Sequence, residues 1–253
     1  MANSVVVYRG IPFARAGRFR PPEPIPLAET PAPDGQFGPP VGQNPDDLDY
    51  MWGEVLAPGS EDCLTLNIWT PAADDVRRPV MVWIHGGAFI IGSGRWGWYE
   101  GTRLVEREQV VLVTLNYRLG AFGFLDLSGV GGPEFAASGN CGLLDQIAAL
   151  RWVKENIPRF GGDPDCVTVF GESASGISIS CLLACPQAAG LFRRAICMSG
   201  SPQHITGASL PAPDWNPLSP NSQAPSSFFL DERPCCCTLV NQSVADRTSG
   251  GSP

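Results

Sequence analysis

The sequence predicts an α/β fold in which helices flank a mostly parallel sheet. Residues 80–84 and 110–115 are continuous runs of apolar, largely β-branched side chains, which is the pattern of strands buried inside a parallel sheet. A helical stretch around residues 101–108 lies between the two runs. Strands that alternate with helices in this order form parallel sheets, because the connecting helices pack on the faces of the sheet.

The clearest predicted helix covers residues 141–157, where apolar side chains recur at helical spacing. Asn140 is its predicted N-cap, and Pro158 is predicted to end it. The other predicted elements are a half-buried strand over residues 64–69, a strand over 167–170, a small-residue helix from Ser173 and a strand that begins at 195–198.

Two parts of the chain differ in composition. Residues 1–203 carry the predicted strands and helices and are interpreted as the folded part, although residues 9–60 are rich in Pro and Gly and predict an irregular opening segment. Residues 204–253 are crowded with Pro, Ser, Asn and Gly, lack periodicity and include a cysteine triplet at 235–237. This second part is interpreted as a disordered or aberrant tail.

Composition excludes several classes of function. The net charge of −8, without a basic cluster, argues against a nucleic-acid partner. No stretch reaches the roughly 18 apolar residues of a membrane span. The start of the chain lacks the features of a signal peptide, so a cytoplasmic location is expected. The nine cysteines form no C-x-x-C pair, so no metal site is expected.

Ser173 is the candidate nucleophile. It stands where the apolar run 167–170 turns into a small-residue helix, which is the setting of a nucleophile elbow. The usual pattern is G-x-S-x-G, but Ser175 occupies the second glycine position and Gly176 comes one residue later. By itself this imperfect motif leaves open a chance serine-rich turn.

A glycine loop strengthens this interpretation. Gly86 and Gly87 follow the buried run 80–84, and adjacent glycines let backbone N–H groups approach a substrate. Together with the N–H of Ala174, they are predicted to form an oxyanion hole; the alternative is a plain glycine turn after a strand. His85 is interpreted as a residue that shapes this loop, and not as a catalytic base. Glu172, next to the nucleophile, is expected to be a buried supporting residue.

A competing motif lies in residues 92–97, which fit the dinucleotide pattern G-x-G-x-x-G. That pattern belongs directly at the end of a strand and at the start of a helix. Here the strand ends near Ile84 and the glycine loop intervenes, so nucleotide binding is disfavoured.

Taken together, these segments closely resemble the type-B carboxylesterase family, which also contains the cholinesterases. The resemblance covers about residues 5–203 and implies an α/β-hydrolase fold, a small-molecule carboxylic ester as substrate and no cofactor. It also implies that Ser173 is the nucleophile and that Gly86, Gly87 and Ala174 form the oxyanion hole. The matching segments, in family order, are residues 8–14, 18–22, 61–67, 85–89, 116–120, 139–146, 160–164, the Ser173 elbow and 198–201.

The catalytic acid and histidine are not identifiable in this chain. In this fold the triad follows the order serine, acid, histidine. His85 precedes Ser173, and no Asp or Glu lies between Ser173 and His204, the only other histidine. The chain is therefore expected to be the N-terminal portion of an esterase domain, apparently truncated and inactive as an incomplete copy. The alternative is a catalytically dead esterase-like module used for binding or adhesion.

Overall fold

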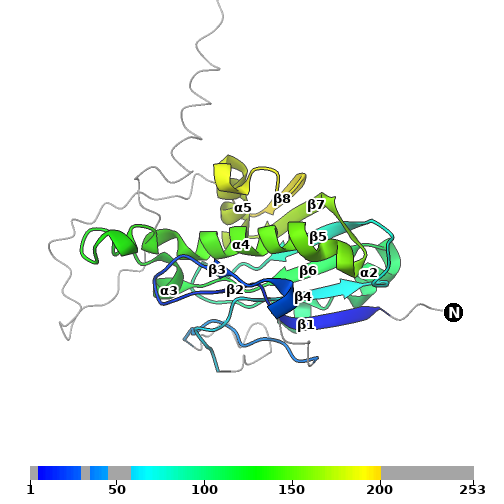
Figure 1. The fold of residues 1–253 in the computed structure, drawn as a ribbon, viewed down its shortest axis with the longest axis horizontal. Helices are drawn as coiled ribbons and strands as arrows, with labels where there is room; N and C mark the ends of the chain where they lie inside the picture. The colour runs from blue at the N-terminus through cyan, green and yellow to red at the C-terminus, as the bar shows by residue number, and fades with distance from the viewer. Residues whose placement is uncertain (1–4, 30–34, 45–57, 201–253) are drawn as a thin grey trace, which may run out of the picture.

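The structure, a computed structural model, describes residues 5–29, 35–44 and 58–200, and it confirms an α/β fold built on one mixed, mostly parallel sheet (Figure 1). The six strands of this sheet lie in the order β1-β4-β6-β5-β7-β8. β1 and β4 are antiparallel to their neighbours, whereas β6, β5, β7 and β8 run parallel. The strands are β1 (Val6–Pro12), β4 (Thr65–Thr70), β5 (Arg78–Ile84), β6 (Val111–Leu115), β7 (Gly162–Glu172) and β8 (Arg194–Met198); β2 (Ala14–Arg15) and β3 (Glu23–Pro24) form a separate pair.

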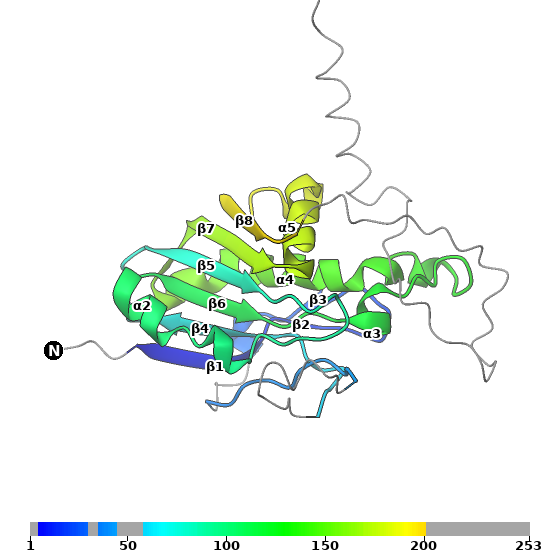
Figure 2. The same cartoon turned by 180° about the vertical axis from the view of Figure 1, so that it is seen from behind.

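The helices cover the two faces of the sheet unequally, as Figures 1 and 2 show from opposite sides. Helices α4 (Cys141–Asn156) and α5 (Ala174–Ala184) pack on one face, and α2 (Thr102–Glu108) packs on the other face near β4. The remaining helical elements are α3 (Gly120–Phe124) and the 3-10 turns η1 (Leu27–Glu29), η2 (Gly97–Tyr99), η3 (Pro133–Phe135), η4 (Ser138–Asn140), η5 (Ile157–Phe160) and η6 (Pro186–Ala188).

The main core lies between the sheet and helices α4 and α5. Alternate strand residues point into it, and Val80, Val82 and Ile84 of β5 are fully buried there. A smaller core under α2 contains Trp69 and Val105 with Val110 and Leu112. Side chains on alternate positions of one strand thus reach two different cores, because a strand directs successive residues to opposite faces.

The predicted strands and helices of residues 64–198 are confirmed, but several details were wrong. The strand at residues 64–69 was expected to be half-buried, yet every residue of β4 is buried because both of its faces are covered. Residues 9–60 were expected to be irregular, yet β1 extends to Pro12 and pairs with β4. β1 shows no clear alternation of buried and exposed residues, and its pairing with β4 depends on residues more than fifty positions away in the sequence.

The N-terminal end of α4 also differs from the prediction, whereas its C-terminal end agrees with it. Asn140 precedes the helix, but its side chain makes no capping hydrogen bond because η4 leads directly into α4. The predicted stop is confirmed, since α4 ends at Asn156, and Pro158 then lies in the first turn of the 3-10 turn η5. A first-turn proline is tolerated there because its missing N–H would have no partner in the turn.

Across the part of the chain that the structure describes, no helix is both long enough and apolar enough to cross a membrane. The predicted tail at residues 204–253, with His204 and the cysteine triplet, lies outside the described residues.

Candidate active site

The candidate site lies where β5 and β7 end side by side. The two strands are parallel neighbours, and Ile84 is aligned with Gly171. The glycine loop after β5 and the Ser173 turn after β7 therefore leave the sheet at the same edge. The carboxyl edge of parallel strands is the usual place of a ligand site in open α/β sheets.

Ser173 occupies a sharp turn between β7 and α5, as predicted. Its backbone has φ 60° and ψ −122°, a region that residues other than glycine rarely adopt. The turn is held by the Ser173 N–H, which donates to the carbonyl of Met198 at 2.8 Å, and by the Ile177 N–H, which donates to the carbonyl of Ser173 at 3.2 Å. The side chain of a residue in such a turn stands clear of the strand and the helix that it joins.

Ser175 fits the turn despite replacing the expected glycine. It is fully buried, and its hydroxyl donates to the carbonyl of Glu172 at 2.7 Å. The required glycines are its neighbours. A Cβ on Gly171 would lie 2.7 Å from the carbonyl oxygen of Ile84, and a Cβ on Gly176 would lie 2.9 Å from the carbonyl oxygen of Met198.

Gly86 lies against the Ser173 turn, and Ala174 directly follows Ser173. A Cβ added to Gly86 would lie 3.5 Å from the Cβ of Ser173 and only 2.6 Å from the carbonyl oxygen of Glu172. Only glycine allows the loop to approach the elbow this closely. Ala174 is the first residue of α5, so its N–H has no acceptor within the helix and remains available for an oxyanion.

Gly87 begins a tight turn of left-handed residues. Its φ is +108°, and Ala88 and Phe89 follow at 54° and 62°. The carbonyl of Gly87 accepts the N–H groups of Ile90 and Ile91, both at 3.0 Å. This turn folds the loop back on itself just after Gly86, which is buried against the Ser173 turn, whereas Gly87 is partly exposed.

His85 packs against the buried side of the glycine loop. It is buried, its ring stacks on Tyr117 with centroids 4.5 Å apart, and its Nδ1 lies 2.8 Å from the carbonyl oxygen of Gly86. The Tyr117 hydroxyl donates to the carbonyl of His85 at 3.0 Å. Burial lowers the pKa of His85 from 6.5 to about 4, so the ring is neutral near pH 7. This placement agrees with a loop-shaping role.

Gln43 is a supporting residue that the sequence interpretation missed. Its side chain makes two hydrogen bonds with the backbone of Gly92: the Gly92 N–H donates to Oε1 at 2.7 Å, and Nε2 donates to the Gly92 carbonyl at 2.9 Å. A Cβ on Gly92 would lie 2.7 Å from the Gly86 carbonyl oxygen and from Cε1 of His85, and closer still to Nδ1 of that ring. Gln43 thus holds the far end of the loop against His85. A single glutamine in a Pro- and Gly-rich segment carries no pattern that would reveal this.

Residues 92–97 do not form a dinucleotide loop, in agreement with the sequence interpretation. The segment leads into η2 and not into a regular α-helix. Its glycines serve close packing against the end of β6: the Gly94 N–H donates to Asn116 Oδ1 at 2.9 Å, and the Gly94 carbonyl accepts the Thr114 hydroxyl at 2.7 Å.

The expectation that Glu172 is buried was wrong. Glu172 is exposed, because it is the last residue of β7 and points away from α5 to the face that the described residues leave uncovered. It lies beside Met198 of β8 on that face.

A buried ion pair holds the end of β6 against α4. The Arg118 guanidinium donates to both carboxylate oxygens of Asp145, at 2.7 and 2.8 Å, and the Arg118 N–H also donates to this carboxylate at 3.0 Å. Both side chains are almost completely buried. Although burial opposes the charged form, the bonds and the charge of Asp145 raise the pKa of Arg118 above its usual value.

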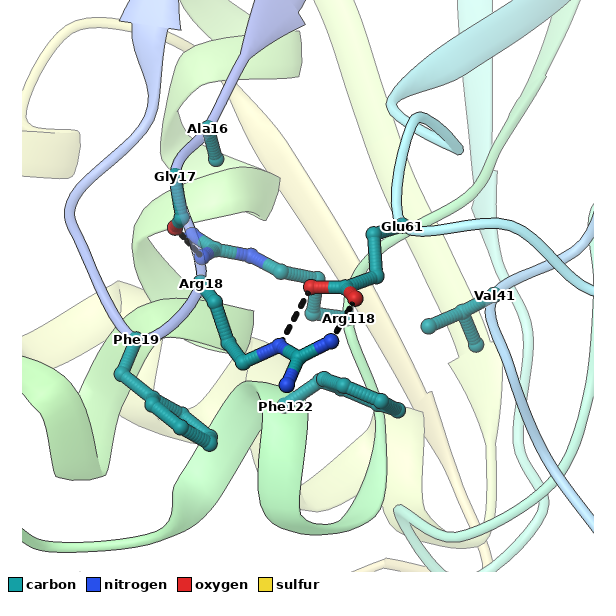
Figure 3. Close-up of a pocket in the computed structure, with 8 residues that line it drawn as sticks. All are labelled: Ala16, Gly17, Arg18, Phe19, Val41, Glu61, Arg118 and Phe122. Atoms are coloured by element: carbon teal, nitrogen blue, oxygen red, sulfur yellow. Dashed lines mark hydrogen bonds and ion pairs between the residues drawn. The ribbon is translucent and has the colours of Figure 1, made fainter.

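Arg118 also reaches the opening segment, at a cavity of about 10 Å³ that has room for roughly one water molecule (Figure 3). Its Nη1 donates to the carbonyls of Arg20 and Gly17. Over the cavity, Arg18 pairs with Glu61 and lies on the Phe122 ring. Neither this cavity nor the larger hollow of about 350 Å³ beside β1 is lined by Ser173. Both are features of the opening segment.

The sheet, the elbow and the glycine loop together define an α/β-hydrolase fold. The Carboxylesterase family model matches residues 1–209, and the chain belongs to this family. It is 49% identical over 208 residues to a para-nitrobenzyl esterase of Bacillus subtilis, covering 81% of this chain but 42% of that protein. It is 43% identical over 210 residues to the acetylcholinesterase of Gallus gallus, covering 79% of this chain and 27% of that protein.

Solved structures give the same result. A carboxylesterase of Geobacillus stearothermophilus matches with a TM-score of 0.67 and 51% identity, covering 78% of this chain and 40% of that one. A thermophilic para-nitrobenzyl esterase matches with a TM-score of 0.72 and 49% identity, covering 79% and 42%. The chain therefore spans less than half the length of these relatives, and it matches their N-terminal part.

Proposed function

We propose that Ser173 is the nucleophile of a carboxylic-ester hydrolase. Its hydroxyl oxygen would attack the carbonyl carbon of an ester and form a tetrahedral intermediate. Collapse of this intermediate expels the alcohol and leaves an acyl group on Ser173, and water then releases the acid. The observation that carries the proposal is the left-handed backbone of Ser173 directly beside Gly86.

The oxyanion would be stabilised by the N–H groups of Gly86, Gly87 and Ala174. Negative charge develops on the carbonyl oxygen during the attack, and fixed backbone donors stabilise it without reorganisation. Ala174 also brings the positive end of α5 to this point, although the helix is short. No part of this arrangement requires a cofactor.

The base that activates Ser173 is the missing component. His85 is engaged with the Gly86 carbonyl and is buried below the loop. In family order, the acid and histidine follow the serine, and such a pair cannot be drawn within these 253 residues. We therefore propose that this polypeptide alone has negligible turnover, whereas Ser173 is competent once an acid and a histidine are supplied.

A fusion protein tests the nucleophile. Residues 1–203 are joined to the carboxyl-terminal part of the Bacillus subtilis para-nitrobenzyl esterase, and hydrolysis of a para-nitrobenzyl ester is measured; this substrate is chosen because the relative is named for it. The fusion protein is expected to hydrolyse the ester and to react with a fluorophosphonate probe. Ser173→Ala should reduce hydrolysis by at least about a thousandfold. Ser180→Ala, a half-buried serine of α5, is the matched control and should change little.

The competing proposal is a catalytically dead binding module. It predicts that a well-folded fusion protein neither hydrolyses the ester nor takes up the probe at Ser173. That outcome would reject the hydrolase proposal. Hydrolysis by the 253-residue chain alone, lost in Ser173→Ala, would instead show that another base serves within this chain.

A further inference from the structure

The glycine loop that follows β5 has a backbone conformation that its own residues do not favour. Four of its residues, Gly87, Ala88, Phe89 and Gly92, have φ angles between 54° and 125°. For Ala88 and Phe89 this left-handed region costs backbone energy, so the conformation persists only where surrounding groups hold it. Contacts with other segments are therefore needed to keep the loop in this shape.

The side chain of Gln43 provides such a contact at the far end of the loop. It accepts the Gly92 N–H at 2.7 Å and donates to the Gly92 carbonyl at 2.9 Å, although Gln43 lies 49 positions earlier in the sequence. An amide side chain can make both bonds to one residue because it carries an acceptor and a donor side by side. Gln43 thus fixes the position and the orientation of Gly92 together.

Gly92 in turn lies against the glycine next to the candidate nucleophile. A Cβ on Gly92 would lie 2.7 Å from the Gly86 carbonyl oxygen, and a Cβ on Gly86 would lie 3.5 Å from the Cβ of Ser173. The two ends of the loop are therefore in contact, and Gly86 alone separates Gly92 from the Ser173 turn. Close packing of this kind transmits a displacement of Gly92 directly to Gly86.

We propose that Gln43 is a positioning residue for the oxyanion hole. Its two bonds to Gly92 keep the N–H groups of Gly86 and Gly87 directed at the carbonyl oxygen of the substrate. The inference rests on the proposed function, because it gives Gln43 a part in the reaction of Ser173. Gln43 acts through the loop, and its effect is large because a displacement of about 1 Å in such a site can cost about 100-fold in rate.

Gln43→Met in the fusion protein tests this role, since methionine has a similar length but cannot make either bond. Oxyanion donors act on the transition state, so kcat should fall about 10- to 100-fold while KM changes less than about threefold. The reaction rate of Ser173 with the fluorophosphonate should fall in parallel.

Thr70→Val is the matched control. The Thr70 hydroxyl contacts the carbonyls of Ala72 and Phe160, both at 2.8 Å, and Phe160 precedes β7 whereas Ser173 follows it. This variant also removes two contacts to backbone groups, but at the opposite end of β7. It should lower the free energy of unfolding in urea without changing kcat more than about twofold. An equal loss of kcat in Gln43→Met and Thr70→Val would overturn the inference.

Gln43→Glu adds a readout that a merely structural role would not give. An ionised carboxylate can still accept the Gly92 N–H but repels the Gly92 carbonyl, whereas a protonated carboxyl group can make both bonds. The ratio of its kcat to that of the native fusion protein should therefore rise as the pH falls from about 8 to about 5. His85, which packs on the other side of Gly92, stays largely neutral over this range because its pKa is about 4. A ratio that does not change with pH would contradict the inference.

Hydrogen exchange in the 253-residue chain separates this inference from the hydrolase proposal. Gln43→Met should speed amide exchange in residues 86–92 at least about tenfold and leave α4 unchanged, because the loop loses its hold on Gly92. If the native fusion protein is inactive, the hydrolase proposal fails, and exchange alone then decides whether Gln43 positions the loop. If the native fusion protein is active but neither exchange nor kcat responds to Gln43→Met, the positioning role is overturned and the hydrolase stands.

Discussion

At the residue scale, the site depends on places where a side chain is not tolerated. Gly86 is the clearest of these, because a methyl group there would collide with the Glu172 carbonyl at 2.6 Å. The loop would have to move away from Ser173, and the two proposed oxyanion donors, Gly86 and Gly87, would move with it. One ångström of displacement is enough to impair such a site.

Gly86→Ala is therefore expected to lower kcat/KM of the fusion protein by about 100- to 1,000-fold, which is the usual effect of losing one oxyanion donor. The reaction rate of Ser173 with the fluorophosphonate should fall in parallel. Gly129→Ala serves as the control, because no atom lies within 4 Å of its added Cβ. Equal activity of the two variants would exclude Gly86 from the site.

His85 gives a pH-dependent prediction. Its pKa is about 4 in the folded protein and about 6.5 in the unfolded chain. Between these values the unfolded chain binds the additional proton, so the free energy of unfolding decreases as the pH falls from about 6.5 to 4. Complete protonation would cost about 3 kcal/mol, at about 1.4 kcal/mol for each unit of pKa difference.

Urea unfolding of the fusion protein at a series of pH values measures this loss. In His85→Gln the part of the pH dependence that belongs to His85 should disappear, so its curve should be flatter than that of the native sequence over this interval. Parallel curves would show that His85 titrates normally.

At the element scale, the ends of strands and helices are fixed by buried polar groups that bridge distant segments. Arg118 follows β6, Asp145 belongs to α4, and Arg118 also binds the carbonyls of Gly17 and Arg20. A single ion pair thus joins three parts of the chain. Removing one partner would leave a buried charge without compensation.

Asp145→Asn is expected to reduce the free energy of unfolding of the fusion protein by about 3–5 kcal/mol, measured in urea. The exposed pair of Arg107 and Glu108 provides the comparison, since Glu108→Gln should cost less than about 1 kcal/mol. Similar losses in the two variants would mean that Arg118 and Asp145 are solvated.

The sequence predicted the elements whose pattern is local. The apolar runs of β5 and β6 and the spacing in α4 are visible within a few residues, and the structure confirms them. The burial of β4 was not predictable, because its polar Asn67 looks like a solvent-facing residue. In the structure Asn67 accepts the Gly10 N–H and donates to the Thr114 hydroxyl, both at 2.9 Å. Gly10 belongs to β1 and Thr114 to β6, so no local sequence pattern indicates these contacts.

In the candidate site, too, local sequence patterns predicted some features, whereas tertiary contacts determined others. The order strand, serine, helix predicted the turn at Ser173, and the adjacent glycines predicted the close loop. The contact of Gln43 with Gly92 and the exposure of Glu172 depend on tertiary packing, so neither followed from the motifs.

At the scale of the whole molecule, the described residues leave Ile196 and Met198 of β8 exposed on one face of the sheet, and this exposure should be detectable in solution. The 253-residue chain is expected to increase the fluorescence of the hydrophobic dye ANS several-fold, because the dye binds accessible apolar surface. In the fusion protein, where the face of the sheet that carries Ile196 and Met198 would be covered, this increase should be largely lost. Ile196→Asp in the chain alone should reduce dye binding, whereas Val130→Asp should not. A chain alone that binds no dye would mean that something already covers Trp83 and Ile196.

The order of the strands in the sheet also determines when the site can form during synthesis. β5 lies beside β7, although β6 and α4 are made between them, and Val82 pairs with Val169. The glycine loop after β5 therefore cannot pack against the Ser173 turn after β7 until most of the described chain has left the ribosome. Parallel pairing over such separations is slow and leaves apolar strands open to wrong partners. Met198, whose carbonyl accepts the Ser173 N–H, is made later still, so the turn of the proposed nucleophile is held in place only after the other described strands of the sheet have been produced.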